Sequence, residues 1–300
     1  MRKLTIPGAP LSEIEIFEYQ YQSQSRGGNG PNVVITGAIH GNEQTGVHAA
    51  RLLMKELEKV EVTGHIKVIP VANPTAYYHR QRVSPFDNVD MSRVFPGSSK
   101  GSLSLRTADA LWGETADAEY IVDLHCCGLT GSTYTLVDYE NFPELKELCV
   151  ATGMPVVCQT SGADGQFYLE SCRRGQKAIL IELPGGQPGG VIDLEWAEFC
   201  SKQLLNYLKY IKAVKGEYVA PTTETVFCGK MDRAVVHNEG LFLPVAKSGD
   251  FLKKGDVIAY LDCEGSRTTY EAPADIRLIS ISLPKYAFIG ESVFGFIPVK

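Results

Sequence analysis

The chain has 300 residues, of which 44% are apolar and 21% charged, and this composition indicates a packed core rather than a disordered chain. Its 35 acidic and 29 basic residues leave a formal net charge of −6, and no basic stripe is present, so we expect no nucleic-acid partner. No run approaches the roughly 20 apolar residues of a membrane span, so we expect no membrane partner either.

The first residues and the cysteines predict a cytoplasmic protein. Arg2 and Lys3 are not followed by the apolar stretch of about 7–15 residues that a signal peptide contains. The eight cysteines are scattered and include no CxxC pair, whereas a secreted disulfide scaffold is shorter and denser. We therefore expect reduced thiols.

The first two-thirds of the chain alternate strand-like and helix-like segments. Val33–Ile39 is a short apolar run that ends in a turn, and Thr45–Val60 has apolar residues at helical spacing. Further strands are expected at His65–Val71, Tyr120–Leu124, Tyr134–Val137, Pro155–Cys158 and Ala178–Leu183, further helices near Leu105–Ala118 and Asp193–Val214, and an irregular stretch at Asn73–Gly101. This alternation predicts an α/β fold with a mostly parallel mixed sheet flanked by helices.

The pattern changes after Lys215. Gly216–Thr225 is typical of a linker, and Val226–Lys300 contains short β runs separated by turns, without a helical pattern of useful length. We expect a larger domain at residues 1–218 and a small all-β domain at residues 219–300.

Three candidate metal ligands follow two of the expected strands. His40 and Glu43 lie three residues apart in the turn between Val33–Ile39 and the next helix, and His125 ends the strand at Tyr120–Leu124. In open parallel sheets, ligands bind at the carboxyl ends of the strands, so the three side chains are expected at one edge. Two histidines and a glutamate form a three-ligand catalytic zinc site with one open position.

Further polar residues supply the remaining chemistry. Glu182 follows the apolar strand at Ala178–Ile181, where a carboxylate can act as general base towards a zinc-activated water. Arg80, Arg82 and Arg93 lie in the irregular stretch, and a guanidinium can hold a substrate carboxylate or stabilise an oxyanion.

Each of these features also has an ordinary explanation. A lone HxxE is common in proteins without a metal. His125 could equally be a hydrogen-bonded histidine at a strand end, and Glu182 could be the partner of a structural salt bridge. Arginines in loops are usually solvated. Their combination at three strand ends is what predicts a metal site.

At these residues the sequence resembles the succinylglutamate desuccinylase/aspartoacylase family of the zinc carboxypeptidase superfamily. The matching segments are Gly37–Gly46 (GAIHGNEQTG), Val71–Ala76 (VANPTA), Asp90–Gly97, Asp123–His125 (DLH) and Ile181–Leu183 (IEL). The resemblance covers about residues 30–190 and implies a zinc carboxypeptidase-like fold. It also implies zinc-dependent hydrolysis of an N-acyl amino acid or a similar small, carboxylate-bearing amide.

The resemblance implies one Zn²⁺ per chain, with His40, Glu43 and His125 as its ligands. It implies Glu182 as general base and Asp90 as the residue that orients a ligand histidine. Cobalt or manganese can substitute in such a site.

For the substrate, the resemblance implies that Arg93 holds a carboxylate and that Arg82, with Arg80 as alternative, polarises the carbonyl. Tyr168 is a further candidate for substrate contact. Ser92 stands where the family usually has Asn, so the carboxylate end of the substrate is expected to be held differently. The sequence therefore leaves the acyl group and the amine part open.

Cys126, next to His125, leaves three readings open: it lines the site, competes for metal, or packs at the strand end.

The C-terminal region resembles the barrel-sandwich domains of biotinyl and lipoyl carriers. The matching segments are Gly240–Pro244, Ser248–Asp250, Lys253–Asp256 and Glu271–Ala274. The MKM and DKA tripeptides that present a modified lysine in such carriers are absent. We therefore expect a non-carrier lid over the active site or a contact in a homo-oligomer.

Two other functions remain open. A carboxypeptidase acting on short peptides would use the same zinc chemistry, and an enclosed pocket rather than an open groove would favour the small amide. A non-catalytic binding protein is the third reading, against which the presence of Glu182 argues.

Overall fold

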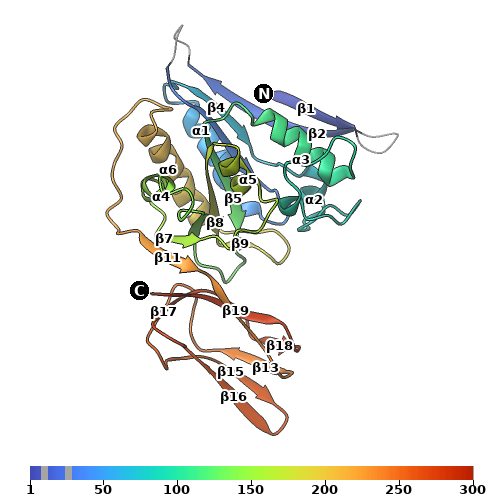
Figure 1. The fold of residues 1–300 in the computed structure, drawn as a ribbon, viewed down its shortest axis with the longest axis vertical. Coiled ribbons are helices and arrows are strands. Elements are labelled where there is room, and N and C mark those ends of the chain that lie inside the picture. Colours follow the sequence, from blue (N-terminus) through green and yellow to red (C-terminus); the bar gives the residue numbers. More distant parts are fainter. Residues whose placement is uncertain (8–12, 24–28, 300) are drawn as a thin grey trace.

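The computed structural model describes residues 1–7, 13–23 and 29–299 (Figure 1). Within them, nine strands form one mixed sheet. In order across the sheet they are β1 (Arg2–Pro7), β2 (Glu13–Gln22), β4 (His65–Ile69), β3 (Asn32–Gly37), β5 (Tyr120–Cys126), β8 (Lys177–Leu183), β6 (Tyr134–Val137), β7 (Val156–Gln159) and β11 (Val226–Lys230).

The central strands β4, β3, β5 and β8 are parallel to one another, and their apolar runs are buried because helices cover both faces. The helices are α1 (Gln44–Leu57), α2 (Pro74–His79), α3 (Leu103–Glu114), α4 (Leu145–Ala151), α5 (Phe167–Arg173) and α6 (Leu194–Tyr210), with a 3₁₀ turn η1 at Met91–Arg93. A Cβ at Gly46 of α1 would lie 2.8 Å from Leu124 Cβ, so glycine lets α1 approach β5 closely. Helix α6 packs on α1, and α5 packs on β8 and β5.

The predicted α/β fold is therefore confirmed, although some elements differ from the expected ones. Strands β1 and β2 extend the sheet as an antiparallel pair that was not predicted. The irregular stretch at Asn73–Gly101 contains α2 and η1, and the short helices α4 and α5 were also not predicted. The structure ends α1 at Leu57, before the expected Val60.

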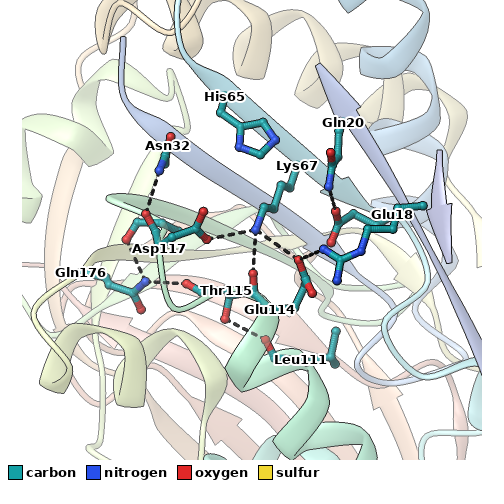
Figure 2. A network of polar contacts seen from close by, with 12 residues as sticks. Glu18, Gln20, Asn32, His65, Lys67, Leu111, Glu114, Thr115, Asp117 and Gln176 are labelled. Atoms are coloured by element: carbon teal, nitrogen blue, oxygen red, sulfur yellow. Dashed lines mark hydrogen bonds and ion pairs between the residues drawn. The ribbon is translucent and has the colours of Figure 1, made fainter. Parts of the chain in front are cut away.

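A partly buried ionic network closes the end of the sheet where β3 and β5 begin (Figure 2). The Nζ atom of Lys67, on β4, lies 2.8 Å from the carbonyl oxygen of Glu114, 3.2 Å from its carboxylate and 3.0 Å from that of Asp117. The side chain of Asn32 donates to the carbonyl of Asp117 at 3.1 Å. These contacts fix the end of α3 against the sheet and leave the opposite end, where β3 and β5 finish, for the polar groups described below.

The C-terminal region is all-β. Within the described residues, one four-stranded sheet has the order β12 (Asp232–Val235), β19 (Ser292–Pro298), β17 (Ile276–Ile281) and β14 (Phe251–Leu252). The other has the order β16 (Ser266–Glu271), β15 (Val257–Cys263), β13 (Gly240–Pro244) and β18 (Lys285–Ala287). A separate apolar core that includes Phe242, Ile258 and Leu278 lies with these strands. The prediction that the C-terminal region is all-β is confirmed. Its more specific resemblance to barrel-sandwich domains stays a prediction.

The segment that joins the α/β region to the C-terminal region forms the last strand of the large sheet. Strand β11 follows the predicted boundary at residue 218, yet it pairs in parallel with β7 (Figure 1). A small two-stranded sheet, β9 (Gly185–Gly186) and β10 (Val191–Ile192), follows β8. In the parts of the chain that are described, no helix has the length and apolar character needed to cross a membrane.

Candidate active site

The turn between β3 and α1 places His40 and Glu43 where two backbone segments cross. A Cβ at Gly41 would lie 1.9 Å from the backbone carbon of Ala76, so only glycine allows α2 to pass this closely. Asn73 caps α2 by accepting from the backbone of Ala76, and its amide donates to Ile39 O at 3.2 Å. The two motifs around His40 and Asn73 are thus parts of one local structure.

His40, Glu43 and His125 form a compact buried group. His40 Nδ1 lies 2.8 Å from Glu43 Oε1, and His125 Nδ1 lies 2.9 Å from Glu43 Oε2. One possible ligand atom from each residue lies within 4.8 Å of the others. Cys126 donates its backbone N–H to Glu43 Oε2 at 3.0 Å. Two imidazoles and a carboxylate that converge in this way fit a His₂Glu metal site.

A second carboxylate contacts each histidine on the side away from Glu43. Asp90 Oδ1 lies 3.0 Å from His40 Nε2, and Asp123 Oδ2 lies 3.1 Å from His125 Nε2. Thr36 in turn donates to Asp123 Oδ1 at 2.8 Å. Both rings therefore present Nδ1 to the centre of the group, the arrangement in which outer carboxylates orient metal-ligating histidines.

Sequence reasoning assigned such a position to Asp90 and overlooked Asp123. The signal was available, because residues two apart on one strand point to the same face, as Asp123 and His125 do.

The pKa values of this group reflect the contacts between its members. Burial alone would raise the pKa of Glu43, but the neighbouring His40 and His125 hold it well below its usual range. Burial opposes protonation of His125, yet Asp123 and Glu43 raise its pKa well above the usual value. The lowered pKa of Glu43 and the raised pKa of His125 thus have one cause, the direct contact of their buried side chains.

Glu182 lies next to this group on β8. It is the in-register partner of His125 on β5 and lines the same cavity. Its Oε2 is buried and has no hydrogen-bond partner among the described residues. Burial and the charge of Glu43 raise the pKa of Glu182 to about 7, so this carboxyl exchanges a proton near neutral pH.

The arginines occupy different positions. Arg82 Nη2 lies 3.1 Å from Asp90 Oδ2, and its Nη1 lies 3.6 Å from Glu43 Oε1. Arg93 Nη1 donates to the carbonyl of Ser92 at 2.6 Å and to its hydroxyl at 3.3 Å. No carboxylate within the described ranges pairs with Arg93. Arg80 ends α2 in a left-handed conformation and does not line the cavity.

One cavity of about 580 Å³ is lined by the three candidate metal ligands together with Glu182, Arg82, Ser92 and Arg93. The C-terminal region supplies part of its wall through Met231, Arg233, Ile279 and Ser280. Tyr168 lies elsewhere: its side chain is fully buried on α5 and does not line the cavity.

Residues that sequence reasoning did not single out also line the cavity. They include Tyr134, Gln159, Gln166 and Arg233. Tyr134 pairs with Glu182 across the neighbouring strands β6 and β8. Arg233 joins the cavity from the C-terminal region. Both placements depend on contacts between distant parts of the chain, which no local motif encodes.

Cys126 and Cys127 also line the cavity. Burial raises the pKa of both thiols, so in the metal-free protein they are protonated at neutral pH.

The sequence of this chain is similar to those of known proteins. The model of the succinylglutamate desuccinylase/aspartoacylase catalytic domain matches residues 29–211. An N-alpha-acetyl-L-2,4-diaminobutyric acid deacetylase of Halomonas elongata is 28% identical over 77% of this chain and 70% of its own length. An N-acyl-aromatic-L-amino acid amidohydrolase of Xenopus laevis is 26% identical over 53% of this chain and 57% of its own length.

Solved structures share the fold along nearly the whole chain. An aspartoacylase family protein from Mesorhizobium loti has a TM-score of 0.83 and 26% identity, covering 99% of this chain and 94% of that one. An ectoine utilization protein from Ruegeria pomeroyi has a TM-score of 0.84 and 24% identity, with the same coverage, and shows likeness of fold. Since the family model spans more than half of the chain, this protein belongs to the succinylglutamate desuccinylase/aspartoacylase family.

Proposed function

We propose that the protein hydrolyses the amide bond of an N-acyl amino acid, or a similar small carboxylate-bearing amide, in a zinc-dependent reaction. The observation that carries this proposal is the convergence of His40, Glu43 and His125 with Glu182 in one cavity. The Halomonas elongata and Xenopus laevis relatives, a deacetylase and an amidohydrolase, support the reaction class.

His40, Glu43 and His125 would hold one zinc ion, with Asp90 and Asp123 fixing the two imidazoles. The ion, when bound, supplies Lewis-acid activation of water and of the amide carbonyl. Zinc is the default metal for two histidines and a glutamate in a catalytic site.

Glu182 has the properties of the general base. Its carboxylate accepts a proton from the attacking water and delivers it to the leaving nitrogen, which departs as the free amine. A pKa of about 7 suits both halves of this transfer, because the group is partly in each protonation state at neutral pH.

The two arginines divide binding from catalysis in this proposal. Arg82 lies beside Glu43, where a guanidinium can stabilise negative charge that develops on the carbonyl oxygen. Arg93, free of a carboxylate partner in the described chain, is assigned to the substrate carboxylate. Ser92 accepts from Arg93 through its hydroxyl, so it orients the guanidinium rather than extending an amide to the substrate.

A carboxypeptidase acting on short peptides is the second candidate. The walls that Met231, Arg233, Ile279 and Ser280 add to the cavity favour a small amide, because they limit the length of chain that fits. We accordingly assign residues 219–300 to a domain that closes the site of a catalytic domain at residues 1–218.

The decisive experiment is a screen of N-acyl amino acids and dipeptides with zinc-loaded protein, in which release of free amine is followed. Hydrolysis of acyl amino acids in preference to dipeptides supports the proposal. Preferred cleavage of dipeptides would establish the carboxypeptidase instead, and binding without turnover of either class would favour a non-catalytic role.

A further inference from the structure

The C-terminal wall of the cavity is fixed to the segment that follows His125. Ser132 donates its backbone N–H to the carbonyl of Ile279 at 2.8 Å, and Gly131 forms an antiparallel bridge with Ser280. The hydroxyl of Ser248 donates to the carbonyl of Thr130. The wall is therefore joined to the loop that directly follows β5, the strand that holds a proposed metal ligand.

Arg233 is the charged residue of this wall. It lies on β12, which pairs with β19, and β19 pairs with β17, the strand that contains Ile279 and Ser280. It is near enough to Tyr134, the in-register partner of Glu182, for the two to interact electrostatically. Arg233, an exposed residue, thus lines the cavity close to the strand end that bears the proposed base.

Arg233 has no carboxylate partner in the part of the chain that the structure describes. Other arginines do: Arg82 pairs with Asp90 at 3.1 Å, and Arg267, also in the C-terminal region, pairs with Asp262 at 2.5 Å. An unpaired guanidinium that faces a cavity is available to a ligand, whereas a paired one is already neutralised.

The other charged residues of the cavity, among those that the structure describes, leave Arg233 without a counter-charge. Among its described lining residues, the acidic ones are Glu43 and Glu182, which the proposed function uses for metal binding and proton transfer. Arg93 and Arg233 are then two positive charges without a counter-charge. An ammonium group on the substrate would meet repulsion, and a second carboxylate would be attracted.

We propose that Arg233 sets the charge selectivity of the site: it binds an anionic group of the substrate other than the carboxylate held by Arg93, and it disfavours substrates that bear an ammonium group. This inference rests on the proposed function. The anionic group belongs either to the amine part or to the acyl part of the substrate, and the experiment below separates the two.

The test compares kcat/KM of the zinc-loaded full-length protein on four substrates: N-acetyl-L-norvaline, N-acetyl-L-glutamate, N-succinyl-L-norvaline and Nα-acetyl-L-ornithine. The native protein is expected to prefer at least one dianionic substrate over the ornithine compound by about tenfold or more. In Arg233→Glu this ratio should fall by about tenfold or more, and in Arg233→Gln by less.

The matched control is Lys230→Glu. Lys230 is exposed on β11, does not line the cavity, and gives the same change in net charge. Its substrate preference should stay within about twofold of the native one, since a screened surface charge acts weakly at a distance. A loss confined to N-acetyl-L-glutamate supports contact with the amine part, and one confined to N-succinyl-L-norvaline supports contact with the acyl part.

If Arg233→Glu leaves the preference unchanged while N-acetyl-L-norvaline is still hydrolysed, the inference is overturned and the proposed function stands. If the native protein hydrolyses neither the four substrates nor any acyl amino acid of the screen described above, the proposed function fails and the inference fails with it.

Discussion

His125 and Glu182 are in-register partners on the neighbouring parallel strands β5 and β8. Side chains of in-register neighbours project from the same face of a sheet, so backbone pairing alone brings a proposed metal ligand next to a proposed base. The alignment does not depend on a loop. Substitutions at either position should therefore change the chemistry of the site while leaving the sheet intact.

Metal content gives the most direct prediction. The purified protein should contain about one zinc per chain, and His125→Ala should lose most of it, because two ligands hold zinc far more weakly than three. Elemental analysis measures the stoichiometry. His48→Ala, on α1 and outside the His40–Glu43–His125 group, is the matched control and should keep its zinc. Full zinc in His125→Ala would remove His125 from the ligand set.

Glu182→Gln should keep zinc and fold but lose at least about 10²-fold in kcat, since the amide cannot accept the proton that general base catalysis transfers. Steady-state rates on the best substrate measure this loss. Glu198→Gln, on the exposed side of α6, should turn over normally. Near-native kcat in Glu182→Gln would mean that another group takes the proton.

The raised pKa of Glu182 predicts a dependence of stability on pH in the metal-free protein. Below about pH 4.5 the carboxyl is protonated in both the folded and the unfolded state, so it contributes no difference. Between that pH and about 7 the unfolded state ionises first, so the free energy of unfolding falls as the pH rises.

Denaturant unfolding of chelator-treated protein at pH 5 and pH 8 tests this dependence. Glu182→Gln should lose less stability over the interval than the native chain, because it has no carboxyl to ionise. An equal loss in both proteins would contradict the raised pKa.

Substitutions of Arg93 and Arg82 should affect different kinetic parameters. Arg93→Ala should mainly raise KM, by about tenfold or more, if the guanidinium holds a carboxylate present in both ground and transition states. Arg82→Ala should mainly lower kcat, by about 10²-fold, if it meets charge that develops during the reaction.

Zinc content must be measured in Arg82→Ala, because Arg82 also contacts Asp90, which orients His40. Arg80→Ala is the control outside the cavity and should behave like the native protein. Equal KM effects from Arg93 and Arg82 with unchanged kcat would contradict the division of roles.

The sequence was informative where a local pattern coincides with a strand end. The apolar runs before His40, His125 and Glu182 predicted buried strands, and parallel pairing then places their ends together. The strand Glu13–Gln22 also had a usable signal, because Ile14 and Ile16 alternate with glutamates.

Other features had no such signal. Helix α5 has seven residues, too few for a helical period to stand out. Arg233 reaches the cavity through sheet pairing and contacts between segments about 150 residues apart in the chain, such as Ser132 with Ile279. No spacing rule connects such segments.

The role of the C-terminal region can be tested by truncation, and the structure shows where to cut. A chain that ends at Lys215 loses β11 as well as the wall, which uncovers the edge of β7 and the apolar side chains of Val156 and Cys158 that pack with Cys228. It should aggregate because an unpaired edge and an apolar patch become exposed.

A chain that ends at Lys230 keeps β11 and removes Met231, Arg233 and the strands that follow. We expect it to retain zinc but to lose most of its activity on the small substrate, because the cavity then lacks the wall that excludes water. Zinc analysis, light scattering and turnover of the two truncated chains, measured together, separate loss of folding from loss of the wall. A monomeric chain 1–230 with native kcat and KM would show that the C-terminal strands do not close the site.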